Sequence, residues 1–185
     1  MIRLLATVSS MLVLLTAPAF AQTGNPGFMT PGTGPQQPNN PDRVFVRAAA
    51  LGGMAEVELG KLAQQKAENG AVHQFALRMV EDHSKANDRL IGLARDDGIA
   101  VPDALDQRRQ AMLDRLQEMS GAAFDRAYIA GQVADHQKTA QLLEYEIGSG
   151  QDVELKTFAS EILPIVLEHL QIAKDVQAQL TGSAS

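Results

Sequence analysis

Apolar residues recur every three or four positions over most of the chain, and short stretches rich in glycine, proline or asparagine interrupt them. This spacing gathers the apolar residues on one face of an α-helix. No stretch shows the period of two that is typical of strands, so the predicted fold class is all-α. Long helices are predicted over about residues 43–68, 71–97, 121–147 and 153–180, with a shorter one over about 104–119.

Single residues mark the ends and the weak points of these helices. Side-chain oxygens suited to capping a helix N-terminus stand at Asp42, Ser120 and Asp152. Pro164 lies inside the last helix, where it should kink the axis or loosen one turn. Gly52, Gly53 and Gly60 lie inside the first helix, with Gly52 on its apolar stripe, and close approach by a neighbouring helix is one explanation for them.

The connections predict how the helices are arranged. The first two long helices, and likewise the last two, are joined by tight turns, so each pair should form an antiparallel hairpin. The link between the second and third long helices has about 22 residues and can travel roughly 40 Å, the length of a long helix. It indicates a ferritin-like four-helix bundle with a long helical crossover between parallel helices 2 and 3. A plain up-and-down bundle has the same core and is the alternative.

The start of the chain differs in composition from the helical region. Residues 1–21 combine a positive charge, an apolar run and an Ala19-Phe20-Ala21 cleavage site, which is the pattern of a secretion signal. An uncleaved membrane anchor is the alternative, but the apolar run is short for a spanning helix. Residues 22–42 predict a disordered linker rich in proline and glycine. The bundle domain should cover residues 43–180, followed by a short tail at 181–185.

Composition limits the partners and the compartment. Cleavage after Ala21 would remove Arg3 and no acidic residue, which changes the formal net charge from −6 to −7. Such an acidic surface disfavours nucleic acid and anionic lipid as partners. No second long apolar segment predicts a membrane span after cleavage, so we expect an exported, soluble protein of the periplasm. Without cysteine, it must be held together by its packed core.

Three of the four histidines fall near the middle of a predicted long helix, in the centre of its apolar stripe: His83, His136 and His169. Glu56 lies at mid-length of the remaining long helix, with Glu58 as the second choice. Glu56 and His83 are 14 and 13 residues from the first turn, so their depths match within about 1.5 Å. His136 and His169 are 14 and 19 residues from the second turn, a mismatch of about 7 Å. Convergence inside the bundle is the central expectation.

Buried imidazoles need either hydrogen-bond partners or a metal ion. Nitrogen and carboxylate groups from several helices commonly build metal sites inside bundles. The three histidines with Glu56 would suit one transition metal ion, and spacing alone does not distinguish zinc, iron, manganese and copper. The alternative is a polar layer in which the histidines bond to each other, to Glu56 or to water.

An acid precedes each of these histidines: Asp82, Asp135 and Glu168. Neighbouring residues on a helix are about 100° apart, so each acid lies on the flank of its stripe. From there it could bond a histidine of the next helix and orient that ring toward a metal. Salt bridges at the bundle surface are the alternative.

Four groups of residues resemble a known family. They are Gly52-Gly53-Met54-Ala55-Glu56-Val57-Glu58-Leu59-Gly60-Lys61-Leu62-Ala63, Phe75-Ala76 with Asp82-His83-Ser84-Lys85-Ala86-Asn87, Phe124-Asp125 with Asp135-His136, and Phe158-Ala159 with Leu163-Pro164 and His169-Leu170. Together, over about residues 43–180, they resemble the exported bacterial proteins called domain of unknown function 4142. The resemblance implies a ferritin-like helical bundle and export from the cytoplasm, and it supplies no established activity.

The chain departs from the usual di-iron pattern of ferritin-like proteins, which places Glu-x-x-His on two helices. Here Val80, Val133 and Val166 stand three residues before the histidines. The acids that two irons need are therefore missing, and one metal ion or none fits better.

No Gly-x-Ser-x-Gly, glycine-rich phosphate loop or His-Glu-x-x-His motif is present, so no enzyme class is predicted. The first hypothesis is an exported bundle protein that binds one transition metal ion for metal handling or a stress response in the cell envelope. The second is a non-catalytic envelope protein whose His/Glu layer only fixes the helix register. A partner-binding adaptor, recognisable by a large apolar surface patch, is the third.

Overall fold

The computed structural model describes residues 38–182. The predicted signal peptide and most of the predicted linker and tail lie outside the described residues. The all-α prediction is confirmed for the described part, which has five helices and no strand. They are α1 (Asn40–Lys66), α2 (Gly70–Asp96), α3 (Gln107–Gln117), α4 (Gly121–Ser149) and α5 (Val153–Gly182). Within residues 38–182 no helix has the length and apolar character that crossing a membrane requires.

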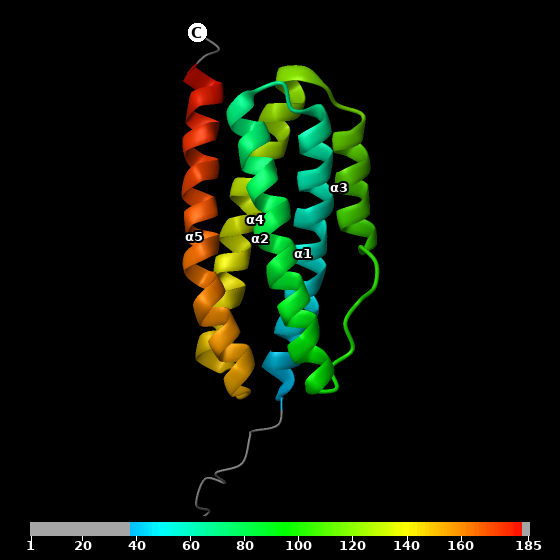
Figure 1. Cartoon of the computed structure of the whole chain (residues 1–185), viewed down its shortest axis with the longest axis vertical. Helices are drawn as coiled ribbons and strands as arrows, with labels where there is room; N and C mark the ends of the chain where they lie inside the picture. Colours follow the sequence, from blue (N-terminus) through cyan, green and yellow to red (C-terminus); the bar gives the residue numbers. More distant parts are fainter. Residues whose placement is uncertain (1–37, 183–185) are drawn as a thin grey trace, which may run out of the picture. The chain divides into compact units, whose positions relative to one another are not determined.

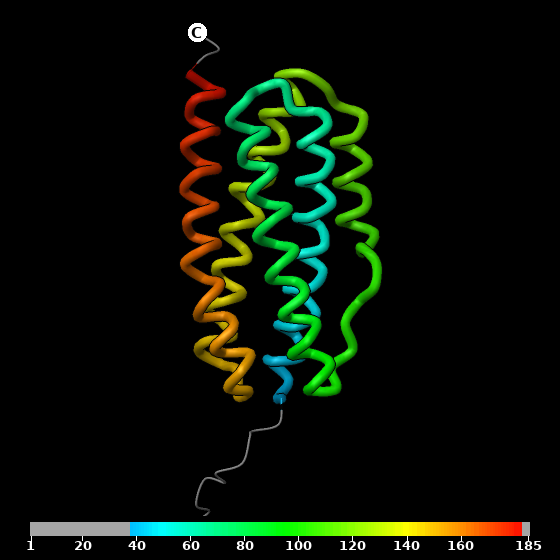
Figure 2. The backbone as a smooth tube through the Cα atoms, viewed as in Figure 1, coloured from blue at the N-terminus to red at the C-terminus, as the bar shows by residue number. Residues whose placement is uncertain are grey.

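The four long helices form a bundle, and α3 lies along its outside (Figure 1). α1 and α2 form one antiparallel hairpin and α4 and α5 the other, with α1 packed on α4 and α2 on α5. Residues 97–120, which include α3, run back along the bundle, so that α2 and α4 point in the same direction (Figure 2). The helical crossover expected from the linker length is therefore present. α5 stays helical through Pro164.

The apolar core is divided into two clusters along the bundle. One cluster is built around Phe45, Leu90, Leu143 and Phe158. The other is built around Phe75, Met79, Phe124, Tyr128 and Ile129. On α2, α4 and α5 a buried histidine lies between the residues of the two clusters, and on α1 the buried Glu56 directly follows Ala55, where the second cluster begins. A polar layer thus divides the core at mid-height.

The helix ends show which capping predictions hold. Asn39, rather than Asp42, caps α1, and Asp42 is the third helical residue, bonded back to Asn39 in a capping box. The helix therefore begins at Asn40, within the predicted linker, because asparagine also caps well. Asp152 caps α5 as expected, and its Oδ1 accepts two backbone N–H groups of the first turn at 2.9 Å each. Ser120 precedes α4 but makes no side-chain cap bond.

Of the three glycines inside α1, Gly53 and Gly60 mark the expected close approach of a neighbouring helix, α2, and Gly52 does not. A Cβ added at Gly60 would lie 2.8 Å from Val80 Cγ2, and one added at Gly53 would overlap the side chain of Asn87. A Cβ at Gly52 would meet nothing within 4 Å. The interpretation of Gly52 as a helix contact is wrong because Gly52 lines a cavity.

Candidate metal centre

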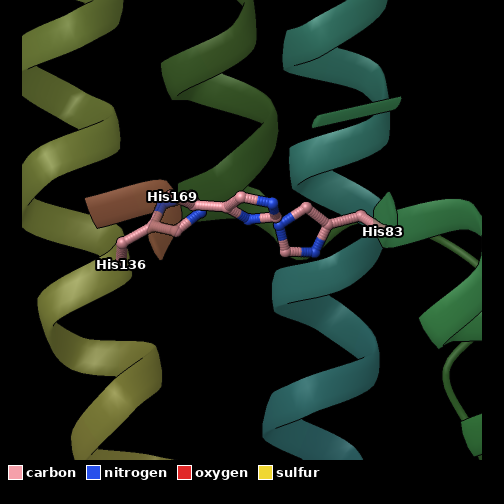
Figure 3. Close-up of side chains that lie close together, drawn as sticks. All are labelled: His83, His136 and His169. Atoms are coloured by element: carbon pink, nitrogen blue, oxygen red, sulfur yellow. The ribbon is translucent and has the colours of Figure 1, made fainter. Parts of the chain in front are cut away.

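Three histidine rings meet inside the bundle (Figure 3). His83 comes from α2, His136 from α4 and His169 from α5, and their ring centroids lie 5.5 to 5.6 Å apart. One ring nitrogen of each lies within 4.8 Å of one ring nitrogen of both others. The three residues are 9%, 1% and 1% exposed. Three of the four groups expected to converge therefore do so.

The turn between α4 and α5 explains how His169 reaches the level of His136. Residues 150–152 lie outside both helices, so they add little to the depth of His169. Counted from the helix ends, His136 lies 13 residues before the end of α4 and His169 lies 16 residues after the start of α5. The difference corresponds to about 4.5 Å of helical rise. The ring centroids lie 5.5 Å apart, so a height difference of this size is compatible with contact between the two rings.

For two of the rings, a hydrogen bond decides which nitrogen is left for a metal. His136 Nδ1 lies 3.0 Å from the backbone carbonyl of Gln132, which only accepts, so Nδ1–H donates and Nε2 carries the lone pair. His169 Nε2 lies 2.9 Å from Asp82 Oδ2, so here Nε2–H donates and Nδ1 carries the lone pair. Among the described residues, His136 Nε2, His169 Nδ1 and His83 Nε2 have no hydrogen-bond partner, although all are buried. Buried nitrogens without partners are costly, and a cluster of three matches a metal ligand set.

Burial keeps these rings neutral. Desolvation lowers the pKa of His83 to about 3 and that of His136 to about 4, and the mutual repulsion of charged rings adds to the shift. Burial also lowers the pKa of His169, although the hydrogen bond to Asp82 opposes the shift. At neutral pH the three imidazoles are therefore uncharged, which is the form that binds metal ions.

Glu56 is buried beside the histidines. Its Oε2 accepts a hydrogen bond of 2.8 Å from Gln132 Nε2, and its Oε1 lies 4.0 Å from His136 Nδ1. Burial raises the pKa of Glu56 to about 8, although the bond from Gln132 opposes the shift. The contact with His136 is therefore no ion pair at neutral pH. The three nitrogens grouped above include no carboxylate partner, so Glu56 as a fourth ligand stays a prediction.

Two of the other predicted acids lie toward the surface. The side chain of Glu58 is 46% exposed and pairs with Lys61 at 2.8 Å. That of Asp135 is 26% exposed and pairs with Lys138 at 3.2 Å. Both form ion pairs with a lysine one turn away on their own helix. Glu58 is thereby turned away from the histidines.

The acids on α2 and α5 have different roles although each precedes a histidine. Asp82 bonds the ring of His169, the role of orienting a neighbouring histidine that the sequence allowed. Glu168 forms an exposed ion pair with Arg78 at 2.9 Å. Arg78 also lies 3.3 Å from Asp82, so it links the two acids at the α2–α5 seam.

Near the histidines, sequence reasoning missed two buried polar residues of α4, Gln132 and Tyr128. Gln132 contacts both Glu56 and His136, since its side-chain amide donates to Glu56 and its backbone carbonyl accepts from His136. The Tyr128 hydroxyl is buried without a partner in the described chain. Burial raises its pKa, and the charge of Glu56 adds to the shift. The sequence signal that could have found them is their spacing, because Gln132 and Tyr128 lie four and eight positions before His136 and so share its helix face.

The chain is similar to a known protein family and to a solved structure. The profile of a family described as a domain of unknown function (DUF4142) matches residues 28–176, as the resemblance in the sequence implied. A solved structure, a DUF305 fragment from Deinococcus radiodurans, has a TM-score of 0.69 over 78% of this chain and 99% of that chain. Its sequence identity is 10%, so the likeness concerns the fold alone. A search of curated proteins by sequence found no match.

Proposed function

The chain belongs to the DUF4142 family, and we propose that its three buried histidines bind one transition metal ion. One observation carries the proposal. His136 Nδ1 and His169 Nε2 are bonded to protein acceptors, and the other nitrogen of each ring, like His83 Nε2, is buried without a partner in the described residues. A layer that only fixed the helix register would be expected to pair these three nitrogens as well.

The donor set fits a first-row transition metal. Nitrogens around a tetrahedral zinc ion lie about 3.3 Å apart, and the ligand atoms of the three histidines, within 4.8 Å of one another, are near that spacing. Zinc, iron, manganese and copper all accept imidazole. Three histidines leave a coordination position open, and Glu56 is the predicted fourth ligand. Once bound, the ion would supply a Lewis-acidic or redox-active centre, depending on its identity.

The proposal extends to the fold family and the compartment. Two antiparallel hairpins joined by a helical crossover between parallel helices support a ferritin-like bundle. The signal-peptide pattern in residues 1–21 supports export. Metal handling or a stress response in the periplasm is the role that these features favour.

Metal analysis of the chain, purified without a histidine tag, tests the proposal. We expect close to one equivalent of metal per chain, and its loss in the double variant His83→Ala/His136→Ala. His73→Ala is the matched control, because His73 lies at the start of α2 outside the group and should leave the metal bound. A metal-free protein whose stability does not change on adding zinc, iron, manganese or copper would overturn the proposal and leave a structural polar layer.

A further inference from the structure

A cavity of about 330 Å³ adjoins the histidine group and is lined by residues of all five helices. Its volume is at the lower end of the range for small-molecule sites. His83 and Glu56 line it at the level of the candidate metal centre. Phe158 also lines it, eleven residues before His169 on α5, which corresponds to about 16 Å along the helix. The cavity therefore extends from the histidines into the phenylalanine-containing cluster of Phe45 and Phe158.

Small residues of α1 leave this space open. Ala48, Ala49, Gly52 and Ala55 line the cavity on that side, and a Cβ added at Gly52 would meet nothing within 4 Å. Opposite them, apolar side chains that are almost fully buried form the walls: Leu90, Leu143, Phe158 and Val166. The part of the cavity between these residues is apolar, and such a space attracts water weakly and accepts an apolar group.

The mouth of the cavity carries more positive than negative charge. Arg108, Arg109 and Lys138 line it together with Asp135, and Arg108 and Lys138 are exposed, which identifies this side as the opening. Arg109 pairs with Asp106, and Lys138 pairs with Asp135. Within the described part of the chain Arg108 is in no ion pair, although its charge acts on Asp106, so two arginines face this one acid.

We propose that the cavity binds a small amphiphilic carboxylate, with its head group at the arginines of α3 and its apolar body directed toward Phe158. Two neighbouring guanidinium groups offer the planar, forked donors that bind carboxylates well. The walls beyond them supply apolar surface for a short alkyl chain. This proposal rests on the cavity and its charges and does not require a bound metal ion.

Calorimetric titration of the chelator-treated chain with octanoate tests this proposal. 1-Octanol serves as the analogue without a carboxylate, and acetate as the analogue without a long alkyl chain. We expect octanoate to bind at least tenfold more tightly than 1-octanol, and acetate not to bind measurably. The variant Arg108→Gln/Arg109→Gln should lower the octanoate affinity to that of 1-octanol. Arg115→Gln, an exposed arginine of α3 outside the cavity lining, should leave it unchanged. Equal affinities for octanoate and 1-octanol, or no binding, would overturn the proposal.

A variant whose side chain fills the cavity tests whether octanoate binds there. Gly52→Leu should lower the octanoate affinity at least tenfold, because the added side chain enters open space beside Glu56. Gly92→Leu is the matched control, since a Cβ on this helical glycine of α2 also meets nothing within 4 Å and lies outside the lining. Unchanged octanoate binding in Gly52→Leu would overturn the proposal that the ligand lies in this cavity. Because the titrations use chelator-treated protein, a missing metal would overturn only the metal proposal, and missing octanoate binding only this one.

Discussion

His169 on α5 donates its Nε2–H to the carboxylate of Asp82 on α2 across 2.9 Å. The bond selects the tautomer of His169 whose Nδ1 lone pair is left for the histidine group. Burial opposes ionisation of Asp82, but the bonds from His169 and Arg78 lower its pKa, so the acceptor is a charged carboxylate at neutral pH. A charged acceptor behind an imidazole strengthens that ring as a metal ligand.

Replacement of Asp82 by asparagine should weaken metal binding about 10- to 100-fold without unfolding the bundle. The amide is uncharged, and its NH₂ group can face His169 and favour the wrong tautomer. Competition with a chromophoric chelator measures the affinity. Glu168→Gln is the control, because Glu168 also precedes a histidine but pairs with Arg78. Equal affinities of Asp82→Asn and Glu168→Gln would contradict the orienting role of Asp82.

A second prediction concerns the stability cost of the site. His83→Leu should abolish metal binding and raise the free energy of unfolding of the metal-free chain by about 1 kcal/mol. Leucine fills a similar volume and removes a buried nitrogen that has no partner in the described residues. Urea unfolding at pH 7 with chelator present measures the change, and His73→Leu should give no such gain. A clear loss of stability in His83→Leu would mean that the imidazole makes a favourable interaction of its own.

Apolar periodicity was sufficient to predict the helices and the inward direction of the histidines, but counting residues from the second turn left a mismatch of about 7 Å between His136 and His169. His83, His136 and His169 each lie at the centre of a stripe, and a stripe centre points inward whatever the small rotations of its helix. Glu56 lies on the flank of its stripe, so its direction depends on how α1 is rotated against its neighbours. The bond from Gln132 to Glu56 could not be predicted, because the two residues are 76 positions apart in sequence.

The acids that precede the histidines also show what the local sequence pattern cannot predict. Asp82 and Glu168 both precede a buried histidine, so the local pattern gives them equal roles. The structure separates them because Asp82 lies at the α2–α5 seam, 2.9 Å from His169, while Glu168 is exposed. Which flank of a helix meets a neighbour is a property of the packed bundle, and the spacing within one helix does not contain it.

A third prediction follows from Glu146 on α4, which is buried beside Asp42 at the end of the bundle. Burial, and then its contacts with Asp42, raises the pKa of Glu146 to about 8. The folded chain therefore keeps a proton that the unfolded chain releases above an ordinary pKa of about 4.5. Linkage then requires that stability fall as pH rises from about 4.5 to 8, by up to about 1.4 kcal/mol per pH unit for this group.

Glu146→Gln imitates the protonated carboxyl and should remove this contribution. Its free energy of unfolding should fall less than that of the unchanged chain between pH 6.5 and pH 8, in urea titrations with chelator present. Part of the fall should persist, because burial shifts the pKa of Glu56 in the same direction. Glu144→Gln, an exposed site on the same helix, should follow the unchanged chain. Parallel curves for Glu146→Gln and the unchanged chain would show that Glu146 is ionised in the folded protein.

The glycines of α1 give a fourth prediction with opposite signs at two positions of one helix. Gly52→Ala should stabilise the chain by about 1 kcal/mol, because alanine favours the helix and its Cβ meets nothing within 4 Å. Gly60→Ala should destabilise it by about 1–3 kcal/mol, because its Cβ would lie 2.8 Å from Val80 Cγ2 and 3.2 Å from the Ala76 carbonyl oxygen. Urea unfolding of both variants measures the two effects. The gain in helix propensity is common to both, so their difference isolates the α1–α2 contact, and stabilisation by both would show that the two helices separate at little cost.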